Sequence, residues 1–206
     1  MNREPTVLVV DDDNLMRAAL RRVFVAANIP VETFSSGDEL LTGGDLRPPA
    51  VLLLDVMMPG MTGIELQGKL RQRGVELPVI FLTGFADIPM AVAAMRDGAV
   101  DFLEKPFDNA ELVARVRKAL ARYTDPAGQP ARPSRADYER RLATLTPRER
   151  EVTDLMIAGK TSKEIARELG GSFRTIEIHR ARIMRKMSAA NLADLVRMPF
   201  DLEVEA

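Results

Sequence analysis

Charged and polar side chains stand at the ends of short apolar runs in the first half of the chain. Asp11 and Asp12 follow one run, Asp55 and Thr83 each end another, and Lys105 follows a further one. Adjacent carboxylates repel one another unless a cation lies between them, and hard oxygen ligands suit Mg²⁺ or Mn²⁺. The residue types therefore predict a divalent cation held by the aspartates at one edge of the fold.

A cation at this edge would prepare the site for phosphoryl chemistry. It would neutralise the oxygens of an incoming phosphate, and Lys105 can pair with another phosphate oxygen. Asp55 is then an oxygen nucleophile toward phosphorus, and Thr83 can donate its hydroxyl to a third oxygen. The alternative is structural, with Asp11 and Asp12 as helix caps, Asp55 as a turn former and Lys105 as a solvated charge. The arrival of all these residues at one edge favours the chemical interpretation.

The apolar runs alternate with segments of helical periodicity between residues 7 and 123. Residues 51–54 are wholly apolar up to the aspartate that follows, as in a strand buried on both faces. Strict alternation predicts an α/β fold, a doubly wound parallel sheet of five strands whose carboxyl ends carry the ligand site. Aspartates stand where a dinucleotide-binding fold would have glycines, which argues against a Rossmann cofactor. The expected helices are Asn14–Ala27, Ser36–Leu41, Thr62–Gln72, Ile88–Arg96 and Asn109–Tyr123.

Composition narrows the class of protein. The 206 residues exceed one typical domain, and the absence of cysteine excludes disulfides and thiol chemistry. No apolar run approaches the length of a membrane span, and the N-terminus does not resemble a signal peptide. We expect a cytoplasmic protein with no membrane partner.

The second half of the chain has a different pattern. Residues 124–137 hold three prolines and a glycine with no large apolar side chain, which predicts a linker. Beyond it only helical periodicity appears, and the stretch Thr146-Pro147-Arg148-Glu149 predicts a capping box. Two short helices joined by Gly170-Gly171 have helix-turn-helix spacing.

Charge is distributed unevenly between the two halves. Residues 144–197 carry 11 basic and 7 acidic side chains, whereas residues 1–122 carry 14 basic and 17 acidic ones. A basic module of this kind indicates a polyanionic partner, although scatter among surface charges is the alternative.

The segment Phe173–Met187 separates into two faces when it is placed on a helical wheel. An exposed isoleucine is unusual on a solvated face, but in a major groove Ile178 can meet a thymine methyl while arginines reach guanine edges or phosphates. The alternative for Arg182, Arg185 and Lys186 is that they complement the negative end of the helix dipole. One face has Ile176, Ile183 and Met187, and the opposite face has Arg174, Ile178, Ala181, Arg182 and Arg185.

The pattern of Asp11-Asp12, Asp55, Thr83 and Lys105-Pro106 resembles the receiver domain of two-component response regulators, over residues 5–123. The resemblance implies a flavodoxin-like sheet of order 2-1-3-4-5 and phosphorylation of Asp55 by a histidine kinase. It implies that the Mg²⁺ site is completed by the backbone carbonyl of Met57. It further implies a cis Lys105-Pro106 peptide and a switch pair of Thr83 and Phe102. Without the resemblance, Phe102 would be assigned to the core.

The stretches Leu145–Val152, Lys163–Ala166 and Thr175–Arg180 resemble the LuxR-type helix-turn-helix domain. The match runs from about 144 to 198. We expect this domain at 141–200, after a linker at 124–140 that is either extended or a continuation of the preceding helix. Together the two resemblances imply a response regulator of the FixJ/NarL type, with the FixJ branch closest because of Glu177, His179 and Arg180. The glycines at 170 and 171 depart from the family pattern and leave the angle between the two helices open. The implied DNA contacts are Lys163, Arg174, Thr175, Ile178, Arg182, Arg185 and Lys186.

We therefore expect a transcription regulator with no external substrate to turn over. Mg²⁺-dependent phosphorylation and dephosphorylation of Asp55 would control homodimerisation, through the surface of Ile88–Arg96 and the helix after it, and binding to promoter DNA. RNA polymerase is a further candidate partner. Two rivals remain: a phosphatase-like or phosphorelay protein built on the same aspartate edge, and an output module that binds another protein.

Overall fold

The computed structural model describes residues 4–84, 88–96, 98–124, 135–189 and 192–200. The chain divides into two compact units, residues 1–87 with 98–129 and residues 88–97 with 130–206. Each unit has an apolar core of its own. The domain bounds expected from the sequence, 5–123 and 141–200, stay a prediction.

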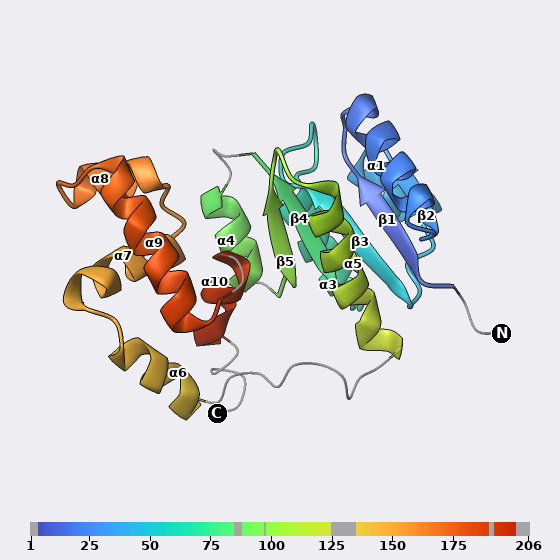
Figure 1. Ribbon diagram of the computed structural model, residues 1–206. Coiled ribbons are helices and arrows are strands. Elements are labelled where there is room, and N and C mark those ends of the chain that lie inside the picture. Colours follow the sequence, from blue (N-terminus) through green and yellow to red (C-terminus); the bar gives the residue numbers. More distant parts are fainter. Residues whose placement is uncertain (1–3, 85–87, 97, 125–134, 190–191, 201–206) are drawn as a thin grey trace. The chain divides into compact units, whose positions relative to one another are not determined.

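The first unit is built on a parallel sheet of five strands in the order β2-β1-β3-β4-β5 (Figure 1). This confirms the predicted fold class and strand order. Every residue of β1 and β4 is buried, and β3 is buried up to its final aspartate, as expected for strands covered on both faces. The strands are β1 (Thr6–Val10), β2 (Val31–Phe34), β3 (Ala50–Asp55), β4 (Val79–Thr83) and β5 (Asp101–Glu104).

Alternate side chains of the strands face different helices. Val7, Val9 and Leu53 belong to the core cluster that also contains Leu20 of α1 and Val116 of α5. On the other face Phe81 of β4 lies against Gly63 at the start of α3. Among the described residues of this unit, the helices lie close to the predicted ranges: α1 (Asn14–Ala26), α2 (Gly37–Gly43), α3 (Gly63–Gln72) and α5 (Asn109–Thr124).

The second unit is helical. It includes α4 (Ile88–Arg96), which the sequence assigns to the first domain, together with the C-terminal helices. In α4 the side chains of Val92 and Met95 are buried. The helices that follow are α6 (Arg135–Ala143), α7 (Pro147–Ile157), α8 (Ser162–Glu168), α9 (Phe173–Met187) and α10 (Leu192–Phe200).

Helix α6 shortens the predicted linker of residues 124–140. It is stabilised by ion pairs between Arg135 and Glu139 and between Arg140 and Asp137, which lie one turn apart. Tyr138 of α6 packs against the second core. The remaining linker, residues 125–134, lies outside the described residues.

No helix in the described part of the chain is both long and apolar enough to cross a membrane.

Candidate phosphoacceptor site and DNA interface

The aspartates predicted from the sequence meet at the carboxyl edge of the sheet. Asp11 follows β1 and Asp55 ends β3, and these strands are neighbours, with Val10 opposite Leu54. One carboxylate oxygen from each of Asp11, Asp12 and Asp55 lies within 4.8 Å of the others. Asp11 is fully buried, Asp55 is partly buried and Asp12 is exposed. This donor set fits a hard divalent cation that keeps some of its waters on the open side.

The helix cap next to these aspartates is Asp13, which removes the capping interpretation of Asp11 and Asp12. The Asp13 side chain accepts hydrogen bonds from the backbone amides of Leu15 and Met16 at the start of α1. Asp11 accepts one from the backbone amide of Asp13, at 2.9 Å. Arg17 donates to the carbonyl oxygens of Asp11 and Asp12, at 2.7 and 2.9 Å, and so fixes the loop that presents both carboxylates.

Lys105 supplies the positive charge of the site. Its Nζ lies 3.0 Å from Asp11 Oδ2 and 3.2 Å from Asp55 Oδ2, and its side chain is 23% exposed. Burial lowers the pKa of Lys105, but the hydrogen bond and the charge of Asp11, together with Asp55, outweigh it and raise the pKa above its ordinary value. The lysine is therefore a cation at neutral pH, held between two carboxylates rather than solvated.

Burial also raises the pKa of Asp55 above the ordinary aspartate value. Lys105 opposes this shift, and the negative charge of Asp11 adds to it. A further cation placed beside such an aspartate would stabilise its ionised form.

Thr83 is fully buried at the end of β4 and donates its hydroxyl to the carbonyl of Gly84, at 3.0 Å. Phe102 lies on the neighbouring strand β5 and is 6% exposed. The next residue, Leu103, pairs with Leu82 of β4. In this conformation the Thr83 hydroxyl is engaged locally and the aromatic ring lies inside. This burial agrees with the core assignment of Phe102, and its switch role stays a prediction.

The loop after β3 approaches the sheet closely. A Cβ on Gly63 would lie 2.2 Å from the backbone oxygen of Asp55, so only glycine fits at the start of α3. The Gly63 amide donates to the carbonyl of Val56, at 3.0 Å. Met57, whose carbonyl the family resemblance assigns to the metal, lies in this loop with its side chain 51% exposed.

Arg115 on α5 is a residue that sequence reasoning missed. Its guanidinium contacts Asp101 Oδ1 at 2.7 Å, the Phe102 carbonyl at 3.1 Å and Glu111 Oε1 at 2.5 Å. It therefore ties α5 to the backbone of the strand that carries Phe102. The helical spacing of Glu111 and Arg115 is the only local signal, because Asp101 is fourteen residues away. The peptide bond between Lys105 and Pro106 is cis, as the resemblance implied.

The second unit has the helix-turn-helix geometry predicted from its glycines. Gly170 adopts φ +62° after α8, and the Gly171 amide donates to the carbonyl of Ala166, at 2.9 Å. This bond closes the end of α8, so Gly170 lies outside the helix in the left-handed conformation that glycine favours. The two glycines end α8 and turn the chain without a helical penalty. Ser172 then caps α9 by accepting from the Thr175 amide, at 3.1 Å.

The two faces of α9 are arranged as the helical wheel predicts. Ile176, Ile183 and Met187 are buried against the second core. Ile178 is 46% exposed among arginines. Of the expected DNA contacts, those with exposed side chains are Lys163, Arg174, Thr175, Ile178, Arg182 and Arg185.

Lys186 differs from the other expected DNA contacts because it has partners within the protein. Its Nζ lies 2.6 Å from Glu149 Oε2 and 3.0 Å from the Thr144 carbonyl. Glu149 is 3% exposed and caps α7 through the backbone amide of Thr146. The hydrogen bond from Lys186 is the main reason why the pKa of Glu149 falls to about 2. Lys186 thus joins α9 to the start of α7.

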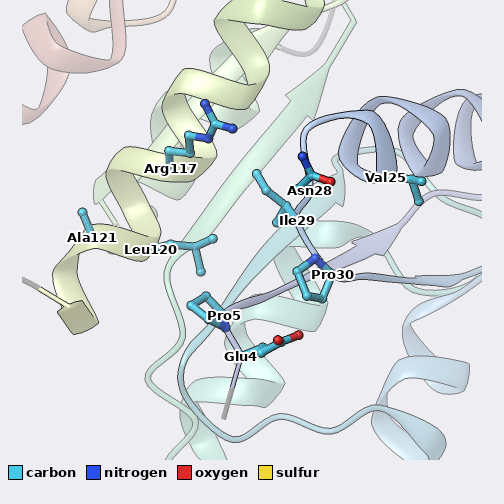
Figure 2. A pocket seen from close by; sticks show the side chains of 9 residues that line it. All are labelled: Glu4, Pro5, Val25, Asn28, Ile29, Pro30, Arg117, Leu120 and Ala121. Atoms are coloured by element: carbon cyan, nitrogen blue, oxygen red, sulfur yellow. The ribbon is translucent and has the colours of Figure 1, made fainter. Parts of the chain in front are cut away.

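A cavity of about 670 Å³ lies in the first unit, near the amino ends of the strands and so at the opposite edge from the aspartates (Figure 2). Val25, Ile29 and Leu120 give it apolar walls, and Glu4 and Arg117 add one charge of each sign. Its lining includes none of the residues that the sequence analysis assigns to phosphoryl chemistry.

Comparison with known proteins identifies a family for each part of the chain. Residues 7–117 match the response regulator receiver domain family, and residues 143–199 match the LuxR family of bacterial regulatory proteins. The chain is 41% identical to the transcriptional regulatory protein FixJ of Azorhizobium caulinodans over 192 residues, which are 93% of this chain and 90% of the relative. This chain belongs to the FixJ/NarL-type response regulators.

Other relatives match this response regulator over nearly their whole length. The C4-dicarboxylate transport transcriptional regulatory protein DctR of Rhodobacter capsulatus is 41% identical over 195 residues, 94% of this chain and 98% of the relative. The crystal structure of full-length FixJ from B. japonicum is 38% identical, with a TM-score of 0.57 and 97% of each chain covered. The response regulator is therefore a transcriptional regulator with a DNA-binding output domain.

Proposed function

We propose that Asp11, Asp12 and Asp55, with the carbonyl of Met57, hold a divalent cation such as Mg²⁺, and that Asp55 accepts a phosphoryl group from a sensor histidine kinase. The observation that carries this proposal is the convergence of three carboxylates within 4.8 Å, beside an ammonium group 3.2 Å from Asp55. A bound Mg²⁺ would supply the positive charge that neutralises phosphoryl oxygens.

Apart from the cation and the phosphoryl donor, the chemical step uses side chains that are already in place. An Asp55 oxygen attacks phosphorus and forms an O–P bond, while the P–N bond of a phosphohistidine or the P–O bond of an acyl phosphate breaks. The leaving group keeps the electron pair. Lys105, which now pairs with Asp11 and Asp55, can turn its ammonium group to the new phosphoryl oxygens.

The phosphoryl group would then compete for the hydroxyl of Thr83. That hydroxyl now donates to the Gly84 carbonyl, and a charged oxygen is the stronger acceptor. Rotation of Thr83 toward the phosphoryl group would free space near β5, into which Phe102 could move. The proposed output is homodimerisation, binding to promoter DNA through the exposed face of α9 and a changed engagement of RNA polymerase.

The test compares Asp55→Asn with a control, Asp38→Asn, an exposed aspartate on α2. The proteins are incubated with acetyl phosphate and Mg²⁺, analysed by intact-mass spectrometry and assayed for retention on duplex DNA. Wild type and the control should gain one phosphoryl group and bind DNA more tightly, whereas Asp55→Asn should gain none and bind at the basal level. Equal labelling of Asp55→Asn would reject the proposal.

A metal-dependent phosphatase on the same edge makes a different prediction. It would release many phosphates per chain from a small phosphate ester, whereas a phosphoacceptor reacts once per regulatory cycle. A phosphate-release assay on the wild-type protein distinguishes the two.

A further inference from the structure

Helix α9 carries a single acidic residue among its basic side chains, and that residue is exposed. Glu177 lies on the surface next to Ile178, and its side chain is 48% exposed. Three arginines of the same helix, Arg174, Arg182 and Arg185, are also exposed. A carboxylate on a surface that faces DNA is repelled by phosphates, so it weakens binding unless it makes a contact of its own.

The carboxylate of Glu177 is held through one of its two oxygens. Ser162, buried at the first position of α8, donates its hydroxyl to Glu177 Oε1 at 2.5 Å. Arg180 Nε lies 3.6 Å from the same oxygen. Within the described residues, neither contact involves Oε2. The side chain is thus oriented by a residue of the other helix of the motif, and one oxygen is left to accept a further hydrogen bond.

The chemistry of the major groove selects a partner for such an acceptor. Guanine presents O6 and N7 and thymine presents O4, all of them acceptors that would repel a carboxylate. Adenine presents its N6 donor beside an acceptor, whereas cytosine presents only the N4 amino group. A lone carboxylate oxygen therefore discriminates in favour of cytosine.

We propose that Glu177 reads one base pair: its Oε2 accepts a hydrogen bond from the N4 amino group of a cytosine, in an orientation held by Ser162 and Arg180. This inference rests on the proposed binding of DNA by α9. It adds that Glu177 determines the base pair at one position of the recognised sequence. Ser162 is a positioning residue, since it acts through Glu177.

The first test is selection of binding sites from a random duplex library by the full-length chain treated with acetyl phosphate and Mg²⁺. Wild type is compared with Glu177→Gln and with Glu151→Gln, an exposed carboxylate on α7 paired with Arg148. Wild type and Glu151→Gln should select a cytosine at one position of each half-site. Glu177→Gln should lose that cytosine, in favour of adenine or of no preference, and keep the other positions.

A direct measurement accompanies the selection. Exchange of the selected C·G pair for T·A should weaken wild-type binding roughly tenfold or more, in the range of other single mismatches, and Glu177→Gln binding by less than about twofold. Ser162→Ala should reduce the ratio of the affinities for the C·G and T·A duplexes. It should leave the preference at the other positions unchanged. A purely structural role of Ser162 would instead weaken binding to all sequences equally.

The results separate this inference from the proposed function. Identical selected sequences for wild type and Glu177→Gln would overturn the role of Glu177 while leaving DNA recognition intact. Selection of no sequence by the phosphorylated wild type would reject sequence-specific recognition by α9, and the role of Glu177 with it.

Discussion

At the scale of single residues, the proposed phosphoacceptor site balances the negative charge of its carboxylates against one internal cation. The ammonium group of Lys105 neutralises part of the negative charge with which Asp11 and Asp55 would otherwise attract a metal ion. Because burial raises the pKa of Asp55, protons also compete with a metal there at a higher pH than at an ordinary aspartate. Cation binding at this edge should therefore weaken on acidification before exposed aspartates begin to titrate.

Replacement of Lys105 by methionine tests this balance. The change removes an ammonium group that repels a second cation, so Lys105→Met should bind Mg²⁺ at least about fivefold more tightly, the factor given by ~1 kcal/mol of repulsion. The same variant should lose phosphorylation-dependent DNA binding, because no ammonium group remains to engage the phosphoryl oxygens. Isothermal titration with Mg²⁺ measures the first effect, and Lys118→Met, an exposed lysine on α5, is the control for net charge. Weaker Mg²⁺ binding in Lys105→Met would contradict the balance.

The pair of Glu149 and Lys186 makes a residue-scale prediction for stability. The folded-state pKa of Glu149 is lowered to about 2 from 4.5, so the stabilisation is complete above about pH 4.5 and is lost as pH falls toward 2. Lys186→Met leaves a buried carboxylate without its main partner and should lower the free energy of unfolding by about 1–3 kcal/mol at pH 7. Urea unfolding followed by circular dichroism should show this difference shrinking between pH 4.5 and about 2.

The exposed pair of Glu151 and Arg148 is the control for that experiment. Glu151→Gln should change the free energy of unfolding by less than about 0.5 kcal/mol at any pH, because exposed ion pairs contribute little. If the free energy of unfolding of Lys186→Met is lowered by the same amount at every pH, lost packing, and not the ion pair, is responsible.

The sequence was informative about residues wherever strand ends determine position. Asp11, Asp55 and Lys105 could be predicted to meet because parallel strands bring their carboxyl ends to one edge. Lys186 could not be separated from the other basic residues of α9, because its partner Glu149 is 37 residues away. The direction of the Thr83 hydroxyl depends on a backbone carbonyl that no sequence pattern reveals.

At the scale of elements, helix starts could be predicted well because capping is local chemistry. Thr62, Thr146 and Thr161 each form a capping box with a glutamate three residues later. Helix α6 was harder to predict, since it begins at Arg135 within a Pro-containing stretch and depends on packing against the second core. That Gly170 lies outside α8 could be established only from its backbone conformation.

Two glycines of α3 give opposite predictions for the same substitution. Gly63→Ala places a Cβ 2.2 Å from the Asp55 carbonyl, so the strand end must move, and both stability and Mg²⁺ binding should fall. At Gly68 nothing lies within 4 Å of a new Cβ, and alanine there should add about 0.5–1 kcal/mol of stability with Mg²⁺ binding unchanged. Thermal unfolding and Mg²⁺ titration of both variants provide the comparison. Equal behaviour of the two would show that α3 does not position Asp55.

The exposed face of α9 makes an element-scale prediction for salt dependence. Arg182→Ala and Arg185→Ala should weaken DNA binding, and each should reduce the slope of log affinity against log salt by about one if the arginine contacts a phosphate. Lys118→Ala, in the other unit, should leave the slope unchanged. Fluorescence anisotropy at several salt concentrations measures all three. An unaltered slope in the arginine variants would place those side chains away from the DNA backbone.

At the scale of the whole molecule, the sequence indicated two units and a pairing surface on Ile88–Arg96 and the helix after it, which stays a prediction. Of the apolar residues on the expected pairing surface of α4 and α5, Met90 is partly buried, and Val92, Met95, Leu112 and Val116 are buried. They belong to the packed interior in this conformation, so pairing through them would need a rearrangement. Phosphorylation at Asp55 is the event that we expect to drive such a change.

Pairing on DNA has a geometric signature that tests this idea. If two copies related by a twofold axis bind two half-sites, each α9 must enter the major groove from the same side of the duplex. Insertion of about 5 base pairs between the selected half-sites turns one to the opposite side and should abolish cooperative binding, whereas about 10 base pairs should restore part of it. Binding titrations on the three duplexes, with mass photometry of the bound species, should show pairs of chains only for the phosphorylated wild type. Equal pairing by Asp55→Asn would show that pairing does not depend on phosphorylation, and the lack of any spacing effect would show that the modules bind DNA as independent single copies.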